Sequence, residues 1–269
     1  MFYPCSVDLS NVPQLKQGVV VLTPAESKRL LAKAVAGLPE VQWAYTNGKL
    51  AVTSGTTDSF VVEELTGEKI DPYRFCVGMS AAGMLTMSAE EDRVLGRFYE
   101  KGQRVDTFYP EFIKSMGRGD VIIKGANAVD PSGNAGVLLC NESGGLVGAM
   151  FGVTSGRGIP VISPVGLEKQ ISSVSDAAAG WGQLTLDYSM GVPVGMSSLT
   201  SVLVVTEIQA LALMAGVRTR LVACGGIGGN EGAVVLLLEG DTDGLDKALR
   251  IIQSLKGEPK IEVPRHHLS

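Results

Sequence analysis

The stretch KLAVTSGTTDSFVVEEL at residues 49–65 decides the fold that this sequence predicts. Its first part, KLAVTS (49–54), is typical of a short strand, SGTT makes a glycine turn, and residues 58–65 form a helical pattern that ends before Gly67. A second stretch, DVIIKGANAVDPSGN (120–134), repeats the apolar strand and the polar turn. In an open α/β sheet, such turns meet at the carboxyl ends of the strands, where ligands bind.

The segments around these two stretches extend the same pattern. Thr23 is the expected N-cap of a helix that runs to Leu38, with Glu26 as its capping-box partner and Pro39 as its stop. The other segments, in chain order, are a strand at 74–80, a helical or mixed segment at 88–102, an apolar stretch at 137–141 and a strand at 159–166. Strands that alternate with helices predict an α/β fold, here a doubly wound, mostly parallel Rossmann-like sheet.

The composition changes after about residue 175, so we expect two domains, 1–175 and 176–269. The expected elements of the second are strands at 192–196, 218–224 and 233–240, helices at 200–215 and 242–255, and an extended piece at 259–263. This order is that of a small ferredoxin-like α+β domain, which we expect to act as a lid or in assembly. Its helix QALALMAG (209–216) is apolar almost all round, which favours a homo-oligomer.

Charge and residue usage exclude several classes of function. The net charge of −5 argues against a protein that binds nucleic acid or a membrane surface, because such proteins need a basic footprint. We expect a cytoplasmic protein, since no run approaches the ~18 apolar residues of a membrane span and the N-terminus lacks a signal-peptide pattern. The four cysteines show no paired spacing, and His266 and His267 lie in the C-terminal tail, so we expect neither metal nor cofactor.

The cysteines are expected to be structural. Cys76, Cys140 and Cys224 each lie in or beside an apolar run. A free cysteine in such a run usually behaves as a small buried hydrophobic side chain.

The order of these motifs resembles that of the ribose-5-phosphate isomerase type A family. The family has G-T-G-S-T before its second helix and D-G-A-D-E-V-D-P further on, which correspond to SGTT (54–57) and GANAVDP (125–131). The stretch that begins VPVGM (192–196) is similar to the family's L-P-V-E-V stretch. The resemblance covers roughly residues 24–240 and extends to a wider fold group with coenzyme A transferases and the effector domains of DeoR-type repressors. Fold kinship alone is an analogy for function.

The resemblance implies that the first turn binds phosphate. Ser54, Gly55, Thr56 and Thr57 match the phosphate loop of the family, in which helix amides and hydroxyl groups hold the phosphate oxygens. A simpler alternative is that Thr56 or Thr57 only caps the helix that follows. The neighbouring Asp58 and Glu63 add negative charge that a phosphate would not favour.

In the second turn the resemblance is partial. Asp130 matches the later carboxylate of the family motif, Asn127 replaces the earlier one, and the family's lysine has no counterpart after Asn134. Asp130 or Glu142 would then be the base for proton transfer between sugar carbons, with Lys124 as its electrostatic partner. We expect Asn127 and Asn134 to contact the ligand.

Lys124 has a plain alternative role. It interrupts an apolar strand, so it must extend its amino group to solvent, reach a ligand or pair with a carboxylate such as Asp120 or Asp130.

Glycine turns further along add three weaker candidates. Gly144 and Gly145 can bring backbone amides to the same crevice, or they belong to a flexible hairpin. Lys169 follows the last strand of the first domain at the ligand end of the sheet, although with Glu168 it is also typical of a solvated ion pair. The loop GGIGGNEG (225–232) has more glycine than a hairpin needs and favours a segment folded over a ligand or subunit.

Three functions remain open at this point. The first is binding of a small phosphorylated or carboxylated metabolite, with isomerisation of a sugar phosphate by carboxylate-mediated proton transfer. The second is a non-catalytic module that binds an effector. The third is acyl transfer from coenzyme A through an exposed glutamate, for which Glu142 and Glu231 are the candidates. In each case the partner is a small anionic metabolite.

Overall fold

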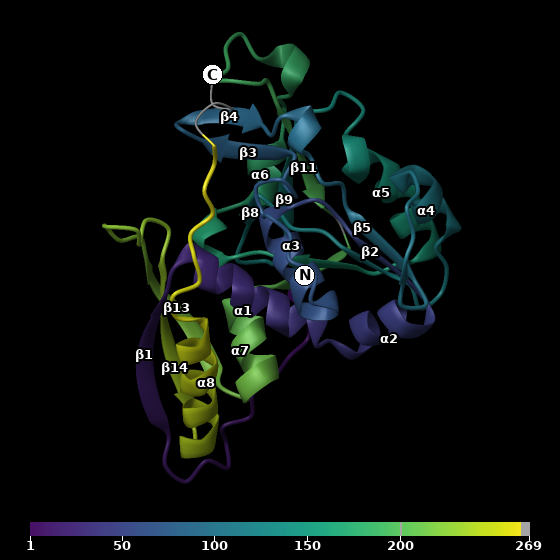
Figure 1. The fold of residues 1–269 in the computed structure, drawn as a ribbon. Helices are drawn as coiled ribbons and strands as arrows, with labels where there is room; N and C mark the ends of the chain where they lie inside the picture. The colour runs from purple at the N-terminus through teal and green to yellow at the C-terminus, as the bar shows by residue number, and fades with distance from the viewer. Residues whose placement is uncertain (200, 265–269) are drawn as a thin grey trace.

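The structure is a computed structural model that describes residues 1–199 and 201–264 (Figure 1). Its central sheet, counted over these residues, has six strands in the order β12-β10-β7-β2-β5-β6. Their bounds are β12 Val202–Val205, β10 Val161–Pro164, β7 Val121–Ile123, β2 Lys49–Val52, β5 Arg97–Glu100 and β6 Gln103–Arg104. The first four strands are parallel to one another, β5 pairs antiparallel with β2, and β6 pairs antiparallel with β5. The expected α/β fold with a mostly parallel central sheet is confirmed.

Helices pack on both faces of this sheet. On one face are α1 (Pro24–Ala36), α2 (Pro39–Asn47) and α3 (Thr56–Thr66), and on the other α4 (Tyr109–Ser115) and α5 (Gly145–Arg157). The strand residues divide between the two cores by alternation, so that Leu50 and Val52 face the first core and Ala51 faces the second. The central strands are therefore buried on both sides, which explains their continuous apolar runs.

The start of α1 confirms the predicted capping box. The Glu26 amide donates to Thr23 Oγ1 at 3.3 Å, and the Thr23 amide donates to Glu26 Oε2 at 2.9 Å. The helix ends at Ala36, but the expected stop at Pro39 is wrong, because Pro39 opens α2. Proline fits this first helical position, since its missing N–H has no partner there in any case.

Replacing Thr23 with alanine is expected to lower the free energy of unfolding by about 1 kcal/mol, because the Glu26 amide loses its acceptor. Urea unfolding of wild type and variant measures the difference. Thr242→Ala is the matched control, since Thr242 opens α8 (Thr242–Leu255) while the capping bond there comes from Asp241. Equal losses in both variants would contradict the capping role.

A second sheet joins the two ends of the chain. Strand β1 (Lys16–Leu22) pairs antiparallel with β14 (Val234–Gly240), which pairs with β13 (Arg218–Cys224). Helices α7 (Glu207–Ala215) and α8 pack against this sheet (Figure 1). The pairing crosses the expected boundary at residue 175, because β1 lies in the small sheet and β12 in the central one. The β-α-β-β-α-β order expected within 176–269 therefore does not describe the strand pairing.

Several predicted elements are wrong in detail. Residues 202–205 form β12 rather than helix, while Thr200 itself lies outside the described residues, as do His266 and His267. The sequence VLVV is rich in branched side chains and favours a strand. Thr206, the N-cap of α7, forms a capping box with Gln209, a start signal that the prediction missed. Helix α7 packs against α1, α8 and β13 of the same chain, so its apolar character no longer argues for an oligomer.

The other differences lie around the mouth of the central sheet. The expected strand at 74–80 is a hairpin of β3 (Gly78–Ala81) and β4 (Met84–Met87), and the segment at 88–102 contains a 3-10 turn and β5. Residues 145–157 form helix α5 instead of a hairpin. The remaining short elements are β8 Ala128–Val129, β9 Ala135–Leu139, β11 Gly195–Leu199, α6 Val174–Ala178 and the 3-10 turns Leu167–Lys169 and Gln183–Thr185.

The described residues form neither a helix that could span a membrane nor a cluster that could hold a metal ion. None of their helices has the length and apolar character that crossing a membrane requires. Over the same residues, histidine, cysteine, aspartate and glutamate side chains do not gather in threes around a point that could hold a metal ion.

Candidate functional site

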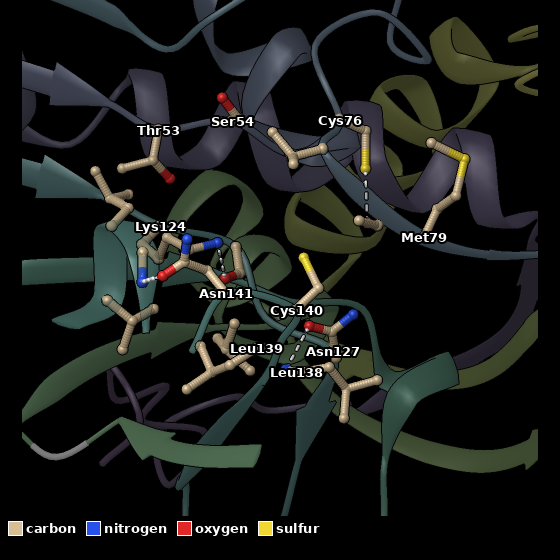
Figure 2. A pocket seen from close by; sticks show the side chains of 18 of the residues that line it. Thr53, Ser54, Cys76, Met79, Lys124, Asn127, Leu138, Leu139, Cys140 and Asn141 are labelled. Atoms are coloured by element: carbon tan, nitrogen blue, oxygen red, sulfur yellow. Dashed lines mark hydrogen bonds between the residues drawn. The ribbon is translucent and has the colours of Figure 1, made fainter. Parts of the chain in front are cut away.

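A cavity of about 510 Å³ lies at the carboxyl ends of β2 and β7 (Figure 2). The SGTT turn, the turn after β7, the β3–β4 hairpin and the start of α5 all contribute to its wall. Nine of the predicted site residues line it: Ser54, Gly55, Thr56, Thr57, Lys124, Asn127, Gly144, Gly145 and Lys169. The two turns singled out in the sequence therefore meet in one cavity.

The strand register explains why the two turns meet. Strands β2 and β7 are parallel neighbours in which Val52 pairs with Ile123. The Thr53 amide continues this ladder and donates to the Ile123 carbonyl at 3.0 Å. Ser54 and Lys124, the next residues on the two strands, consequently leave the sheet at the same edge, as Figure 2 shows.

Asp130 lies outside the cavity, and the expectation that it is the base is not supported. Its carboxylate is buried and accepts hydrogen bonds from the amides of Ser132, Asn134 and Val174 and from the side chain of Asn134. Burial opposes ionisation, but these donors outweigh it and lower the pKa of Asp130. Asn134 is occupied in the same way and does not line the cavity either. Both residues stabilise the turn.

The glutamate candidates are also elsewhere. Glu142 is exposed and lines a separate, more open hollow beside Trp181. Glu231, in the exposed loop between β13 and β14, accepts a hydrogen bond from the Gly229 amide. Neither carboxylate lines the cavity. None of the three carboxylates predicted from the sequence as a base or nucleophile, those of Asp130, Glu142 and Glu231, therefore lines the cavity.

Gly144 and Gly145 line the cavity, but their amides are engaged. The Gly145 amide donates to Asn141 Oδ1 at 3.2 Å, and the Gly144 amide donates to the Asn141 carbonyl at 2.9 Å. Asn141 thus stabilises the turn that leads into α5, whose N-cap residue is Gly144. The expected amide contacts to a ligand from these two glycines are not supported.

Two lysines reach the cavity from neighbouring strands. Lys124 Nζ donates to the Gly125 carbonyl at 3.1 Å, and Lys169 Nζ crosses from the turn after β10 to the Ala126 carbonyl at 2.9 Å. Burial disfavours the ammonium form of Lys169, and the nearby ammonium of Lys28 adds repulsion, so the pKa of Lys169 is lowered. The alternative partner of Lys124, Asp120, instead accepts from the amides of Lys49 and Gly117.

Asp58 is a member of the site that the sequence prediction missed. Its side chain is fully buried, and its Oδ2 accepts from Thr53 Oγ1 and from the Gly125 amide, both at 3.1 Å. Asp58 therefore ties the two turns together from behind the cavity wall. Burial raises its pKa, while Lys124 and Lys169 act in the opposite direction. An acidic residue in the first turn of a helix was the available signal.

Gly55 leaves the space that Asp58 occupies. A Cβ atom on Gly55 would lie 2.8 Å from Asp58 Oδ2, and one on Gly125 would lie 3.3 Å from Asp58 Oδ1. Among the described residues, Oδ1 has no hydrogen-bond partner. The negative charge that looked unfavourable in the sequence is thus a buried counter-charge for the two lysines.

Two cysteines lie in the wall as well. Cys76 is buried, and its Sγ donates to the Gly78 carbonyl at 3.1 Å, while Cys140 is partly exposed (Figure 2). Burial raises the pKa of the Cys76 thiol, although Lys124, Lys169 and the Thr56 amide favour its thiolate. The expectation of a buried cysteine is confirmed for Cys76 and wrong for Cys224, which is exposed.

The rest of the wall is mostly apolar. Its larger side chains come from the β3–β4 hairpin, the segments before β5 and α4, strand β9 and the start of α5: Met79, Leu85, Leu95, Phe108, Leu138, Leu139 and Leu146. Two of them are unusually exposed for their size, Leu95 at 66% and Phe108 at 60%. A cavity with a cationic end and apolar walls suits a ligand that carries one anionic group on an apolar body.

Comparison of the chain with protein-family models, curated proteins and solved structures gives no match. The resemblance to the ribose-5-phosphate isomerase type A family therefore stays an expectation.

Proposed function

We propose that this chain binds a small carboxylated or phosphorylated metabolite in the cavity between the SGTT turn and the turn after β7. The anionic group lies at the start of α3, beside Lys124 and Lys169. The ligand's apolar body extends toward the β3–β4 hairpin. The observation that carries the proposal is the meeting of the Lys124 and Lys169 amino groups with the N-terminus of α3, an eleven-residue helix, in one cavity.

The charge of the cavity supports an anionic guest. The carboxylate of Asp58, buried behind the cavity wall, interacts with both lysines. Burial shifts Asp58 and Lys169 toward their neutral forms, so the ammonium group of Lys124 lacks a full counter-charge, and a partly desolvated ammonium group without a counter-charge is costly. The Thr56 amide and both lysines already favour an anion at Cys76, at the same end of the cavity. A carboxylate or phosphate would balance this charge.

Binding alone is the function that this geometry supports best. Isomerisation through Asp130 or Glu142, and acyl transfer through Glu142 or Glu231, would each need a carboxylate that does not line the cavity. Asp58 lies behind Gly55 and Gly125, so it acts on the lysines rather than on the ligand. A sugar phosphate would also meet mostly apolar side chains with its hydroxyl groups, whereas a carboxylate on a branched alkyl chain fits both ends.

The test uses 2-hydroxy-4-methylpentanoate, its neutral amide and ribose 5-phosphate as probes for thermal stabilisation. We expect the carboxylate to raise the melting temperature and the amide to leave it unchanged, because only the former interacts with the lysines. Lys124→Met should weaken carboxylate binding about tenfold, as expected for the loss of one charge-assisted contact. Isothermal titration measures this change.

Lys247→Met is the matched control, since Lys247 is an exposed residue of α8 that does not line the cavity. It should leave the affinity unchanged. The proposal fails when none of the anionic probes stabilises the wild type, or when the neutral amide binds as well as the acid.

A further inference from the structure

We propose that Lys169 captures a carbonyl group as an imine, so that the ligand of this cavity is an oxo acid. The inference rests on the proposed function and adds the substrate class and a covalent step. Lys169 would be a nucleophile that contacts the substrate, whereas Lys124 and the start of α3 would hold its carboxylate.

The position of Lys169 is the first argument. Its side chain starts from the 3-10 turn Leu167–Lys169 after β10 and reaches the end of the neighbouring strand, where Nζ donates to the Ala126 carbonyl. This one hydrogen bond orients the amine along the cavity wall. Because a backbone carbonyl is a neutral acceptor, the bond holds the amine without fixing it as an ammonium ion, as a close carboxylate partner would.

The charges around Lys169 are the second argument. The Lys28 ammonium group, which repels a charged Lys169, is held at 2.9 Å by Glu168, the residue before Lys169. Burial and this neighbour both favour the neutral amine, while Glu168, Cys76 and Asp58 oppose them. A lysine that is desolvated and lies near another cation has the properties of Schiff-base-forming lysines.

The walls of the cavity supply the third argument. Apolar walls slow the hydrolysis of an imine, and Lys169 shares its cavity with Met79, Leu138 and Leu146. Lys124, at the same end, would pair with a carboxylate next to the reacting carbonyl carbon. A 2-oxo acid with an apolar side chain meets all three features.

The proposed step is balanced by the ligand and the amine alone. The Nζ lone pair of Lys169 attacks the carbonyl carbon, and the C=O π electrons move to oxygen. Proton transfer from nitrogen to oxygen gives a carbinolamine. Loss of the hydroxyl group with one proton, as water, then leaves a C=N bond between the ligand and Lys169.

Borohydride reduction in the presence of 4-methyl-2-oxopentanoate tests the step on the full chain. We expect the mass of one reduced adduct per chain, mapped by peptide digestion to Lys169 and formed about tenfold faster than on exposed lysines. Lys169→Arg removes the primary amine and should lose the adduct, whereas Lys247→Arg, at an exposed residue of α8 that does not line the cavity, should keep it. Peptide mapping of the wild type decides the matter even where a variant does not fold.

The hydroxy acid probe separates the two proposals. When 2-hydroxy-4-methylpentanoate and the oxo acid both stabilise the protein but borohydride leaves no adduct at Lys169, the imine is refuted and the binding function stands. An adduct on Lys124, or one spread evenly over exposed lysines, also overturns the imine. When neither of these acids nor ribose 5-phosphate stabilises the protein, the proposed function fails as well.

Discussion

Replacing Asp130 with alanine is expected to lower the free energy of unfolding by about 3 kcal/mol. The carboxylate accepts hydrogen bonds from two backbone amides and one side-chain amide of its own turn and from the buried Val174 amide at the start of α6. Without Asp130 these donors have neither protein nor full water contact, and each unmet donor costs free energy. Urea unfolding, followed by circular dichroism, measures the loss.

The controls separate a structural carboxylate from a catalytic one. Glu142→Ala should leave stability unchanged, because Glu142 is exposed. Asn134→Ala should cost less than Asp130→Ala, since it removes one donor rather than the shared acceptor. A variant Asp130→Ala that keeps wild-type stability and loses ligand binding would show that the carboxylate serves the cavity after all.

The same carboxylate predicts how stability depends on pH. The folded state lowers the pKa of Asp130 below its ordinary value of 3.8, so the unfolded chain binds its proton first as the pH falls. The stabilisation from Asp130 is therefore complete above about pH 4 and is lost as the pH falls through the folded-state pKa. Asp130→Asn should flatten this acid limb, as unfolding free energies between pH 5 and pH 2 would show.

Much of the cavity was predictable from local sequence. A polar turn after an apolar strand marks the ligand edge of an open sheet, and two such turns had to meet once β2 and β7 became parallel neighbours. The place of Lys124 in the cavity was also predictable, because a lysine at the end of a strand that is buried on both faces needs a partner or a ligand. These features were predictable because each depends only on one strand and the residues that directly follow it.

The parts that were missed depend on contacts between distant segments. The pairing of β1 with β14 joins residues more than 200 positions apart, such as Gln17 and Glu239, and no local pattern reveals it. Helix α5 was missed because Gly148, Gly152 and Gly156 lower its helix propensity, which packing of Val147 and Met150 overrides.

The role of Asp130 was misjudged for a related reason. A carboxylate in a turn has the same appearance in a sequence whether it faces a ligand or gathers amides. The amide of Val174, 44 residues away, decides between them here. The family resemblance implied a catalytic role for Asp130, whereas its hydrogen bonds indicate a structural role.

Arg29→Met is expected to destabilise the protein by about 3 kcal/mol, because it leaves three carboxylates without their shared cation. The guanidinium binds Glu258 through Nε at 2.9 Å and Nη2 at 3.0 Å, Glu63 at 2.6 Å and Glu64 at 3.1 Å. It also lies over the ring of Phe60, 4.3 Å from its centroid. These contacts join α1, α3 and the segment after α8, and Arg29 is 9% exposed, so solvent screens them little.

The matched control is Lys33→Met, one turn along the same helix. Within the part of the chain that the structure describes, Lys33 pairs with Glu64 alone, at 3.1 Å, and its side chain is 34% exposed, so its loss should cost less than 1 kcal/mol. Arg29→Lys should fall between the two, since a lysine keeps the charge but cannot make the paired bonds to Glu258. Because Glu258 is the contact of Arg29 in the segment that follows α8, Arg29→Met should also speed proteolysis after residue 256. Equal stability losses for Arg29→Met and Lys33→Met would mean that the segments are held together by apolar packing alone.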